Sequence, residues 1–451
     1  MDDVLTSTPA LEPVPARVAI RASIDCDNLH ALPSRLGAEA PFLPQIGWSD
    51  SAGDGERWLA LGEIDSLVVP AGSGFGPALE VLARARERLK VLASMAADPG
   101  VVRFVGGIAF DPRHGDNPGW PDGEAARFVL PRVILRQAGG QTEVTVLGTP
   151  EPEARRLIAR IAQAARAQGA ADVPLRVVET ASPEARERWI AAVRAVLGRI
   201  ESGAVRKVVL SRDIVLEAGR PIDAWELLRL IHARDPHGMR FCLRFDAQSA
   251  FLGASPERLV TQRGSAISCD CLAGTIARGT TPEAQARNAA ALLASEKDGR
   301  EHRIVLDEIL AAITPHVRAL ETPAEPRILT LAEVLHLWSP IRAQLREGVD
   351  LRDLVGALHP TAAVGGSPRL RAMDLIHALE QRPRGWYAGL VGWIGADEAD
   401  FAVAIRSGVV RGKRMTAFGG AGIVRGSDPV AEWDETARKA ASFNNLFAER
   451  A

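Results

Sequence analysis

Apolar residues recur at helical spacing in the second half of the chain, with short apolar runs between the helical stretches. From residue 189 to residue 200, apolar side chains fall on one helix face behind a Ser182–Pro183 start, a typical beginning for a helix. The helices predicted in this half are residues 183–203, 282–294, 300–320 and a last helix from Pro429 onward. The runs typical of strands are residues 207–210, 214–217, 241–245, 251–254, 266–271, 327–330, 388–394, 401–405 and 415–419.

The pattern before residue 180 is weaker, because proline, glycine and alanine are frequent there. It predicts one helix over residues 152–168, and its strand-like runs are residues 18–22, 57–61, 104–110 and 143–147. Strands and helices alternate along the chain without a regular βαβ rhythm, which favours an α+β fold with a large mixed or antiparallel sheet flanked by helices. We therefore divide the chain into an N-terminal part, residues 1–178, and a C-terminal region, residues 179–451.

Composition and charge narrow the function classes. The chain has 451 residues, of which 47% are apolar and 24% charged, as in an ordinary globular protein. With a net charge of -2, the chain has no excess of positive charge that would attract nucleic acid or an acidic membrane surface. A small-molecule partner is therefore expected. Neither a signal peptide nor a membrane span is recognisable, which predicts a cytoplasmic protein. The four cysteines are spaced too irregularly for a zinc site, and Cys269 and Cys271 are expected to be buried on one face of a strand.

Two acidic pairs are the first candidates for chemistry. Asp298 and Glu301, and likewise Glu432 and Glu435, are three residues apart on predicted helices, so each pair shares one helix face. Solvated helix faces would explain such pairs without any function. If the carboxylates are buried, their mutual repulsion needs a cation, and a hard divalent ion bound through oxygen is the natural one.

Three further features are candidates for proton transfer and anion binding. Lys207 opens an apolar strand, where burial would favour the neutral amine that can act as a base, although a lysine at a strand end commonly reaches solvent. Glu257 follows a strand and a Ser-Pro turn, a position where loops often carry function. The glycine-rich segment 419–426 precedes the last helix and could present backbone amides to a carboxylate, with Lys439 nearby.

Taken together, these segments resemble the chorismate-utilising enzymes in order and spacing from about residue 180 to the C-terminus. The resemblance makes residues 179–451 the chorismate-binding catalytic region. The matching segments are residues 207–212, 251–259, 272–275, 295–302, 359–361, 384–389, 404–407, 421–424 and 432–436. Upstream, the resemblance is looser and rests on residues 58–62 and 106–112. Within the family, the chain is most similar to the isochorismate synthases of the menaquinone type, through residues 426–429 ahead of the acidic helix.

The resemblance implies a Mg2+-dependent conversion of chorismate to isochorismate, in which water adds at C2 while the C4 hydroxyl leaves. It assigns Lys207 as the general base and Glu257 as the general acid. It makes Glu301 and Glu435 the principal metal ligands, with Asp298 and Glu432 beside the metal, bound directly or through water. The substrate-binding residues that it implies are Gly274, Thr275, His336, Tyr387, Arg406, Gly420, Ala421, Gly422 and Lys439.

Small differences separate the branches of this family. Anthranilate synthases usually carry glutamine at the position of Lys207 and use ammonia from a glutaminase subunit, so we expect no such partner here. Aminodeoxychorismate synthases carry lysine at the position of Ala273. Salicylate synthases share the machinery and then eliminate pyruvate; Trp338 and Ile405 favour a synthase without that lyase step. A catalytically silent chorismate-binding relative is an alternative of another class, and a phosphotransfer enzyme would need a phosphate loop that is missing. Isochorismate feeds both menaquinone and siderophore biosynthesis, and members of the family are often monomers.

Overall fold

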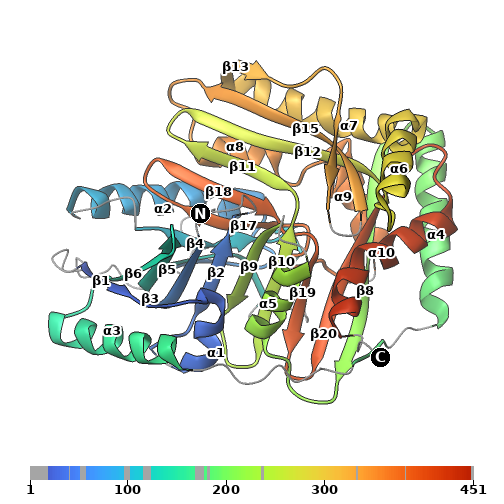
Figure 1. Cartoon of the computed structure of the whole chain (residues 1–451). Coiled ribbons are helices and arrows are strands. Elements are labelled where there is room, and N and C mark those ends of the chain that lie inside the picture. The colour runs from blue at the N-terminus through green and yellow to red at the C-terminus, as the bar shows by residue number, and fades with distance from the viewer. Residues whose placement is uncertain are drawn as a thin grey trace.

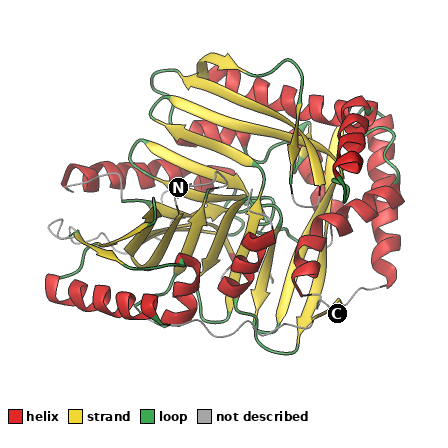
Figure 2. Cartoon of the chain, viewed as in Figure 1, coloured by secondary structure: helices red, strands yellow, loops and turns green. Residues whose placement is uncertain are grey.

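The computed structural model describes residues 19–39, 41–50, 57–95, 102–114, 123–167, 177–179, 183–234, 238–331, 334–380 and 382–447. Its strands form one extended sheet system, and its helices lie around the outside of the strands (Figures 1 and 2). The strand pairs described below are all antiparallel, which confirms the predicted α+β class with a large antiparallel sheet.

Two series of paired strands start from the long strand β5 (Glu124–Ala138), which also pairs with β6 (Gln141–Val146) and, through it, with β1 (Ile20–Ile24). The first series continues through β3 (Arg57–Pro70), β2 (Gln45–Ser49), β9 (Met239–Arg244), β10 (Ser249–Ser255), β19 (Ser407–Arg411), β20 (Arg414–Ile423) and β8 (Lys207–Ala218). Strand β8 also pairs with two short strands, β7 (Val177–Glu179) and β16 (Gly366–Ser367). The second continues through β4 (Phe104–Ile108), β17 (Leu390–Ile394), β18 (Glu398–Val403), β11 (Arg258–Arg263), β12 (Ala266–Ala277) and β15 (Val334–Leu345), which pairs with β13 (Val317–Glu321) and β14 (Arg327–Thr330).

The helices cover these strands, and two of them deliver the acidic pairs. Helix α7 (Glu296–Ile313) packs against β12, and helix α10 (Pro429–Phe447) packs against β20 and α4 (Pro183–Glu201). The remaining helices are α1 (Leu32–Leu36), α2 (Phe75–Met95), α3 (Glu151–Arg166), α5 (Ala224–Arg234), α6 (Pro282–Ala294), α8 (Leu351–Leu358) and α9 (Arg369–Leu379), with short 3-10 turns at Leu29–Ala31 and Thr314–His316. None of the described helices is both long and apolar enough to cross a membrane.

The helical pattern predicted α3, α4, α6 and α10 well, but two boundaries were wrong. The predicted helix over residues 300–320 begins earlier, at Glu296 behind the Ser295 cap, and ends at Ile313. Its last predicted residues form β13 instead, because that segment pairs with β15. The strands predicted over residues 207–210 and 214–217 are one strand, β8, held continuous by its ladder with β20. The predicted cap Ser182 lies outside the described residues.

The glycine-rich segment also differs from its prediction. Gly420, Ala421 and Gly422 are not in a loop but in β20, opposite Ser211, Leu210 and Val209 of β8. The backbone leaves the ladder only after Ile423. Cys269 and Cys271 are buried in β12, as predicted.

The sequence boundary near residue 178 falls within the continuous sheet. Strand β2 of the N-terminal part pairs with β9 of the catalytic region, and β4 pairs with β17. The N-terminal strands therefore support the strands that position the site.

Candidate active site

A pocket opens where β8, β12, β20, α7 and α10 come together. Most of the residues assigned from the sequence line it: Glu257, Gly274, Thr275, Glu301, His336, Tyr387, Arg406, Gly420, Gly422 and Lys439. Ala421 does not line the pocket, because it has no exposed surface and packs into the apolar core. Residues from the beginning, middle and end of the catalytic region thus share one cavity.

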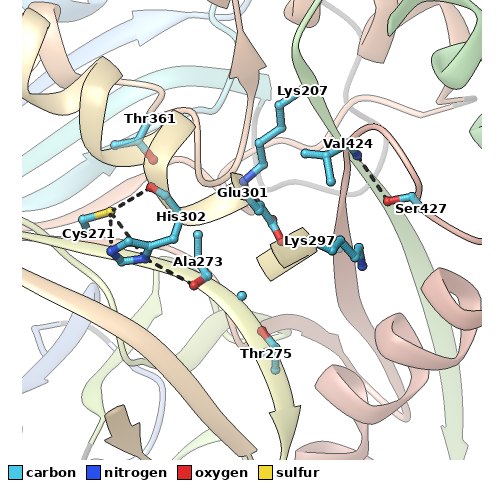
Figure 3. A network of polar contacts seen from close by, with 12 residues as sticks. Lys207, Cys271, Ala273, Thr275, Lys297, Glu301, His302, Thr361, Val424 and Ser427 are labelled. Carbon is cyan, nitrogen blue, oxygen red and sulfur yellow. Dashed lines mark hydrogen bonds and ion pairs between the residues drawn. The ribbon is translucent and has the colours of Figure 1, made fainter. Parts of the chain in front are cut away.

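Lys207 is the first residue of β8 and is fully buried. Its Nζ lies 2.9 Å from Oε1 of Glu301, as an ion pair between a strand and helix α7 (Figure 3). Gly422 of the neighbouring strand makes room for this pair, since a Cβ added there would lie 2.1 Å from Glu301 Oε1 and 2.9 Å from Lys207 Cε. The glycine in β20 is therefore required by the close approach of two charged side chains.

Glu257 lies between β10 and β11 and is 2% exposed. The Thr361 hydroxyl donates to its Oε1 at 3.4 Å, and the Glu257 amide donates to Ser255 Oγ at 3.2 Å. Burial raises the pKa of this carboxyl to about 8, although the positive charge of Lys207 acts in the opposite direction. At neutral pH the group is therefore mainly protonated, as a general acid must be.

His336 lies beside a positively charged side chain, the Arg406 guanidinium. Burial and the nearby Arg406 guanidinium lower the pKa of His336 to about 3, so the imidazole is neutral. Arg406 Nη2 lies 3.4 Å from His336 Nε2, which must accept, and Nδ1 lies 3.2 Å from the carbonyl oxygen of Gly274, to which it can donate. Thr275 Oγ1 is 3.0 Å from the same Nδ1. A neutral histidine thus orients an arginine that borders the pocket.

Lys439 adds a second cation to the pocket. Its Nζ donates to the carbonyl oxygen of Gly420 at 2.9 Å and pairs with Oε1 of Glu435 at 2.7 Å.

Arg406 has a φ of 50°, a left-handed conformation that is unusual for a residue with a side chain. Such backbone strain is maintained where surrounding structure fixes it, commonly at functional sites. The two cations make the pocket suitable for an anionic ligand.

Tyr387 supplies a hydroxyl to the same pocket. Its ring stacks on Phe418 with centroids 4.8 Å apart, and its hydroxyl lies 2.9 Å from where a Cβ on Gly420 would be. Burial raises the pKa of Tyr387 to about 12, so the hydroxyl keeps its proton and can donate a hydrogen bond.

Asp298, Glu432 and Glu435, the other three residues predicted at the metal site, line a second cavity next to the pocket. Thr275 borders both cavities. Asp298 is bonded to the Ser295 hydroxyl, and Glu432 Oε1 pairs with Lys297 Nζ at 2.8 Å. Burial raises the pKa of Asp298 and of Glu432, and neighbouring carboxylates add to both effects. For Glu435 burial acts in the same direction, but Lys439 and Lys297 outweigh it and the net pKa shift is downward.

The chemistry of these acids fits a hard divalent cation. Across the described ranges, no three histidine, cysteine, aspartate or glutamate side chains gather closely enough to hold a metal ion as they stand. Instead, lysines accompany three of the four carboxylates: Lys207 at Glu301, Lys297 at Glu432 and Lys439 at Glu435. The donors are all oxygen atoms on two helices, which is the ligand type that a hard divalent cation takes.

Sequence reasoning missed the partners of the assigned residues. Lys297 lies inside the acidic segment that the sequence singled out. Its ion pair with Glu432 joins α7 to α10, and no local sequence pattern predicts it. Thr361 was noticed only as part of a motif, and its hydrogen bond to Glu257 joins segments far apart in sequence. His302 is likewise held in place by distant groups. Its Nδ1 lies 3.3 Å from the Ala273 carbonyl oxygen (Figure 3), and its Nε2 lies 2.9 Å from Ser339 Oγ.

Comparison with known proteins identifies relatives of this chain. The family model described as "Chorismate binding enzyme" matches residues 45–447. The chain is 36% identical over 378 residues to the salicylate biosynthesis isochorismate synthase of Pseudomonas aeruginosa, covering 81% of this chain and 79% of that protein. It is 34% identical over 352 residues to the isochorismate synthase MenF of Bacillus subtilis, covering 75% and 72% respectively.

Solved structures agree with these sequence matches. The menaquinone-specific isochorismate synthase MenF of Escherichia coli superposes with a TM-score of 0.78 at 27% identity, covering 96% of this chain and 94% of that one. Anthranilate synthase component I of Streptococcus pneumoniae shares the fold, with a TM-score of 0.68 at 19% identity.

Proposed function

The chain belongs to the chorismate-binding enzymes, and on this basis we propose that it is an isochorismate synthase that isomerises chorismate with the help of Mg2+. The relatives named isochorismate synthase, which match most of this chain, support the activity. The observation that carries the proposal is that the pocket is lined both by Glu257, a buried carboxyl that is mainly protonated at neutral pH, and by Glu301, whose carboxylate forms an ion pair with the buried Lys207.

In the proposed reaction, a water oxygen bonds to C2 of the ring, the ring double bonds shift, and the C4 hydroxyl leaves. Lys207 accepts the proton of the attacking water, for which it must enter the reaction as the neutral amine. Glu257 gives its proton to the departing hydroxyl, which leaves as water. One water is taken up and one is released, so the reaction is an isomerisation. Burial supports the role of Glu257, because it raises the pKa of this carboxyl and keeps its proton available.

The pocket residues hold and orient the anionic substrate in this proposal. Arg406 grips a carboxylate of chorismate, since a guanidinium offers two parallel N–H donors to such a group. Lys439 adds positive charge from α10, and Tyr387 donates a hydroxyl hydrogen bond. His336 keeps Arg406 in place, while Gly274, Thr275, Gly420 and Gly422 complete the walls.

The metal would be held by Glu301 and Glu435, with Asp298 and Glu432 as further ligands or as partners of its water shell. When bound, Mg2+ would hold a substrate carboxylate and offset its charge. The carboxylates that would bind it approach from α7 and α10, the two helices that flank the pocket. Their oxygen atoms and mutual repulsion support this assignment.

One assay tests the proposed function. We expect purified protein with chorismate and Mg2+ to yield isochorismate as the product resolved by chromatography, with no change when ammonia is added. Salicylate with pyruvate would indicate a lyase step, and anthranilate would indicate an aminating enzyme. Absence of turnover would favour a silent chorismate-binding relative. Isochorismate formation by the isolated chain would also support action without a glutaminase subunit, and a single species of one chain's mass on gel filtration would support a monomer.

Substituting Glu435 by glutamine tests the metal assignment. Glu435→Gln is expected to raise the Mg2+ concentration needed for half-maximal activity by about tenfold or more, because a ligand charge is lost from the site. Magnesium titrations of activity, together with Mn2+ binding followed by electron paramagnetic resonance, measure the effect. Glu217→Gln on the half-exposed end of β8 is the matched control and should leave both titrations unchanged. An unaltered titration in Glu435→Gln would remove this residue from the ligands.

A further inference from the structure

Lys297 lies in the first turn of α7 and takes no part in the proposed reaction. Its Nζ forms an ion pair with Oε1 of Glu432, in α10, at 2.8 Å. The side chain of Glu432 is 1% exposed, whereas that of Lys297 is 35% exposed. The ion pair therefore joins the two helices that carry the predicted metal ligands, and it supplies a positive charge to a buried carboxylate.

The helix itself does not account for a lysine at this position. The backbone amides of a first helical turn carry partial positive charge, so a cation is disfavoured there and acidic residues are preferred. Both chain neighbours of Lys297, Glu296 and Asp298, follow that preference. The local sequence thus gives no reason for the lysine, whereas its contact with α10 does.

The surroundings of Lys297 are strongly acidic. It lines the second cavity, whose other lining residues include Asp298, Glu432 and Glu435. Burial disfavours its ammonium form, but the negative charges of Glu432, Glu301 and Glu435 outweigh burial and raise its pKa. Lys297 is therefore a cation that lies among the carboxylates assigned to the metal.

Lys297 differs from the other two lysines that accompany these carboxylates. Lys207 is fully buried, while Lys439 pairs with Glu435 of its own helix and also donates to a backbone carbonyl oxygen. Lys297 instead pairs across two helices, and its side chain is the most exposed of the three. It is thus the lysine that can leave its carboxylate and reach water.

We infer that Lys297 takes the place of the metal in the metal-free protein, where its ammonium group neutralises Glu432 and joins α7 to α10 until Mg2+ displaces it. The inference rests on the proposed metal site. A like charge close to a metal ion weakens its binding, whereas loss of the lysine would leave a buried carboxylate without a cation. Lys297 therefore lowers the affinity for the metal and stabilises the metal-free protein.

Binding of Mn2+ followed by electron paramagnetic resonance tests the inference with Lys297→Met, which removes the charge and keeps most of the side-chain length. We expect the dissociation constant for Mn2+ to fall by about tenfold, because the competing cation is gone. In EDTA, the unfolding temperature should be lower than that of wild type, because Glu432 is buried without a cation. Saturating Mg2+ should narrow this difference, since a bound ion stabilises the folded variant.

A second variant and a matched control complete the test. Lys297→Gln keeps a hydrogen-bond donor for Glu432, so it should show the same tighter Mn2+ binding with a smaller loss of stability. Arg303 is exposed on the same helix and forms no ion pair within the described part of the chain, so Arg303→Met should leave Mn2+ binding unchanged.

Two results would count against the inference, and they have different meanings. Unchanged or weaker Mn2+ binding in both Lys297 variants, beside a wild type that binds the ion, would overturn the role of Lys297 and leave the metal site in place. Absence of Mn2+ binding in wild type and variants alike would contradict the metal assignment, and the inference with it.

Discussion

Replacing Lys207 by alanine is expected to reduce kcat for isochorismate formation by about a thousandfold, because no other group would take the proton from the attacking water. Chorismate affinity should change little, since Arg406 and Lys439 remain to bind carboxylates. Steady-state kinetics with chorismate and Mg2+ measure the first quantity, and binding titrations with the inactive variant measure the second.

The burial of Lys207 calls for a second variant. Alanine leaves a cavity and removes the cation that accompanies Glu301, so part of any loss could come from disturbed packing. Lys207→Met keeps most of the volume and removes only the amine. Lys413→Met, in an exposed turn, is the control for losing one positive charge. Near-normal turnover in a folded Lys207→Met would exclude this lysine as the base.

Replacing Glu257 by glutamine is expected to lower kcat by about a hundredfold to a thousandfold, because the amide cannot give a proton to the departing hydroxyl. The alkaline limb of the wild-type profile, near the pKa of about 8 that burial gives this carboxyl, should disappear in the variant. Rates measured from pH 6 to pH 9 test both expectations. Retention of the limb would assign it to another group.

The same substitution should change stability in a direction set by proton linkage. The folded-state pKa of Glu257 is raised, so the folded protein binds more protons than the unfolded chain between the ordinary glutamate value of 4.5 and about 8. Stability from this group is therefore complete at low pH and is lost as pH rises through that window. Glu257→Gln removes the dependence, and its unfolding temperature relative to wild type should be higher at pH 8 than at pH 5. A constant difference between the two proteins would contradict the raised pKa.

The sequence predicted elements best where a local pattern matched the final environment. Helix α6 and the start of α10 were predicted where the structure has them, at Pro282 and Pro429. The prediction from sequence failed where pairing with a distant strand decided the secondary structure of a segment. Residues 317–320 were predicted as the end of a helix but pair with β15, and Gly420 to Gly422 were predicted as part of a loop but extend the ladder with β8. Hydrogen bonds to a neighbouring strand outweigh the weak local preferences of such short segments.

The sequence by itself determined which residue types were available: two acidic pairs on helices, a lysine opening a strand, a glutamate after a turn, and an arginine and glycines near the end of the chain. Only the tertiary structure decided their partners. It placed Lys207 beside Glu301 and buried Glu257, which raises the pKa of that carboxyl so that it keeps its proton. Spacing along a chain fixes which side chains share a local face, whereas burial and charge proximity depend on how distant strands and helices pack.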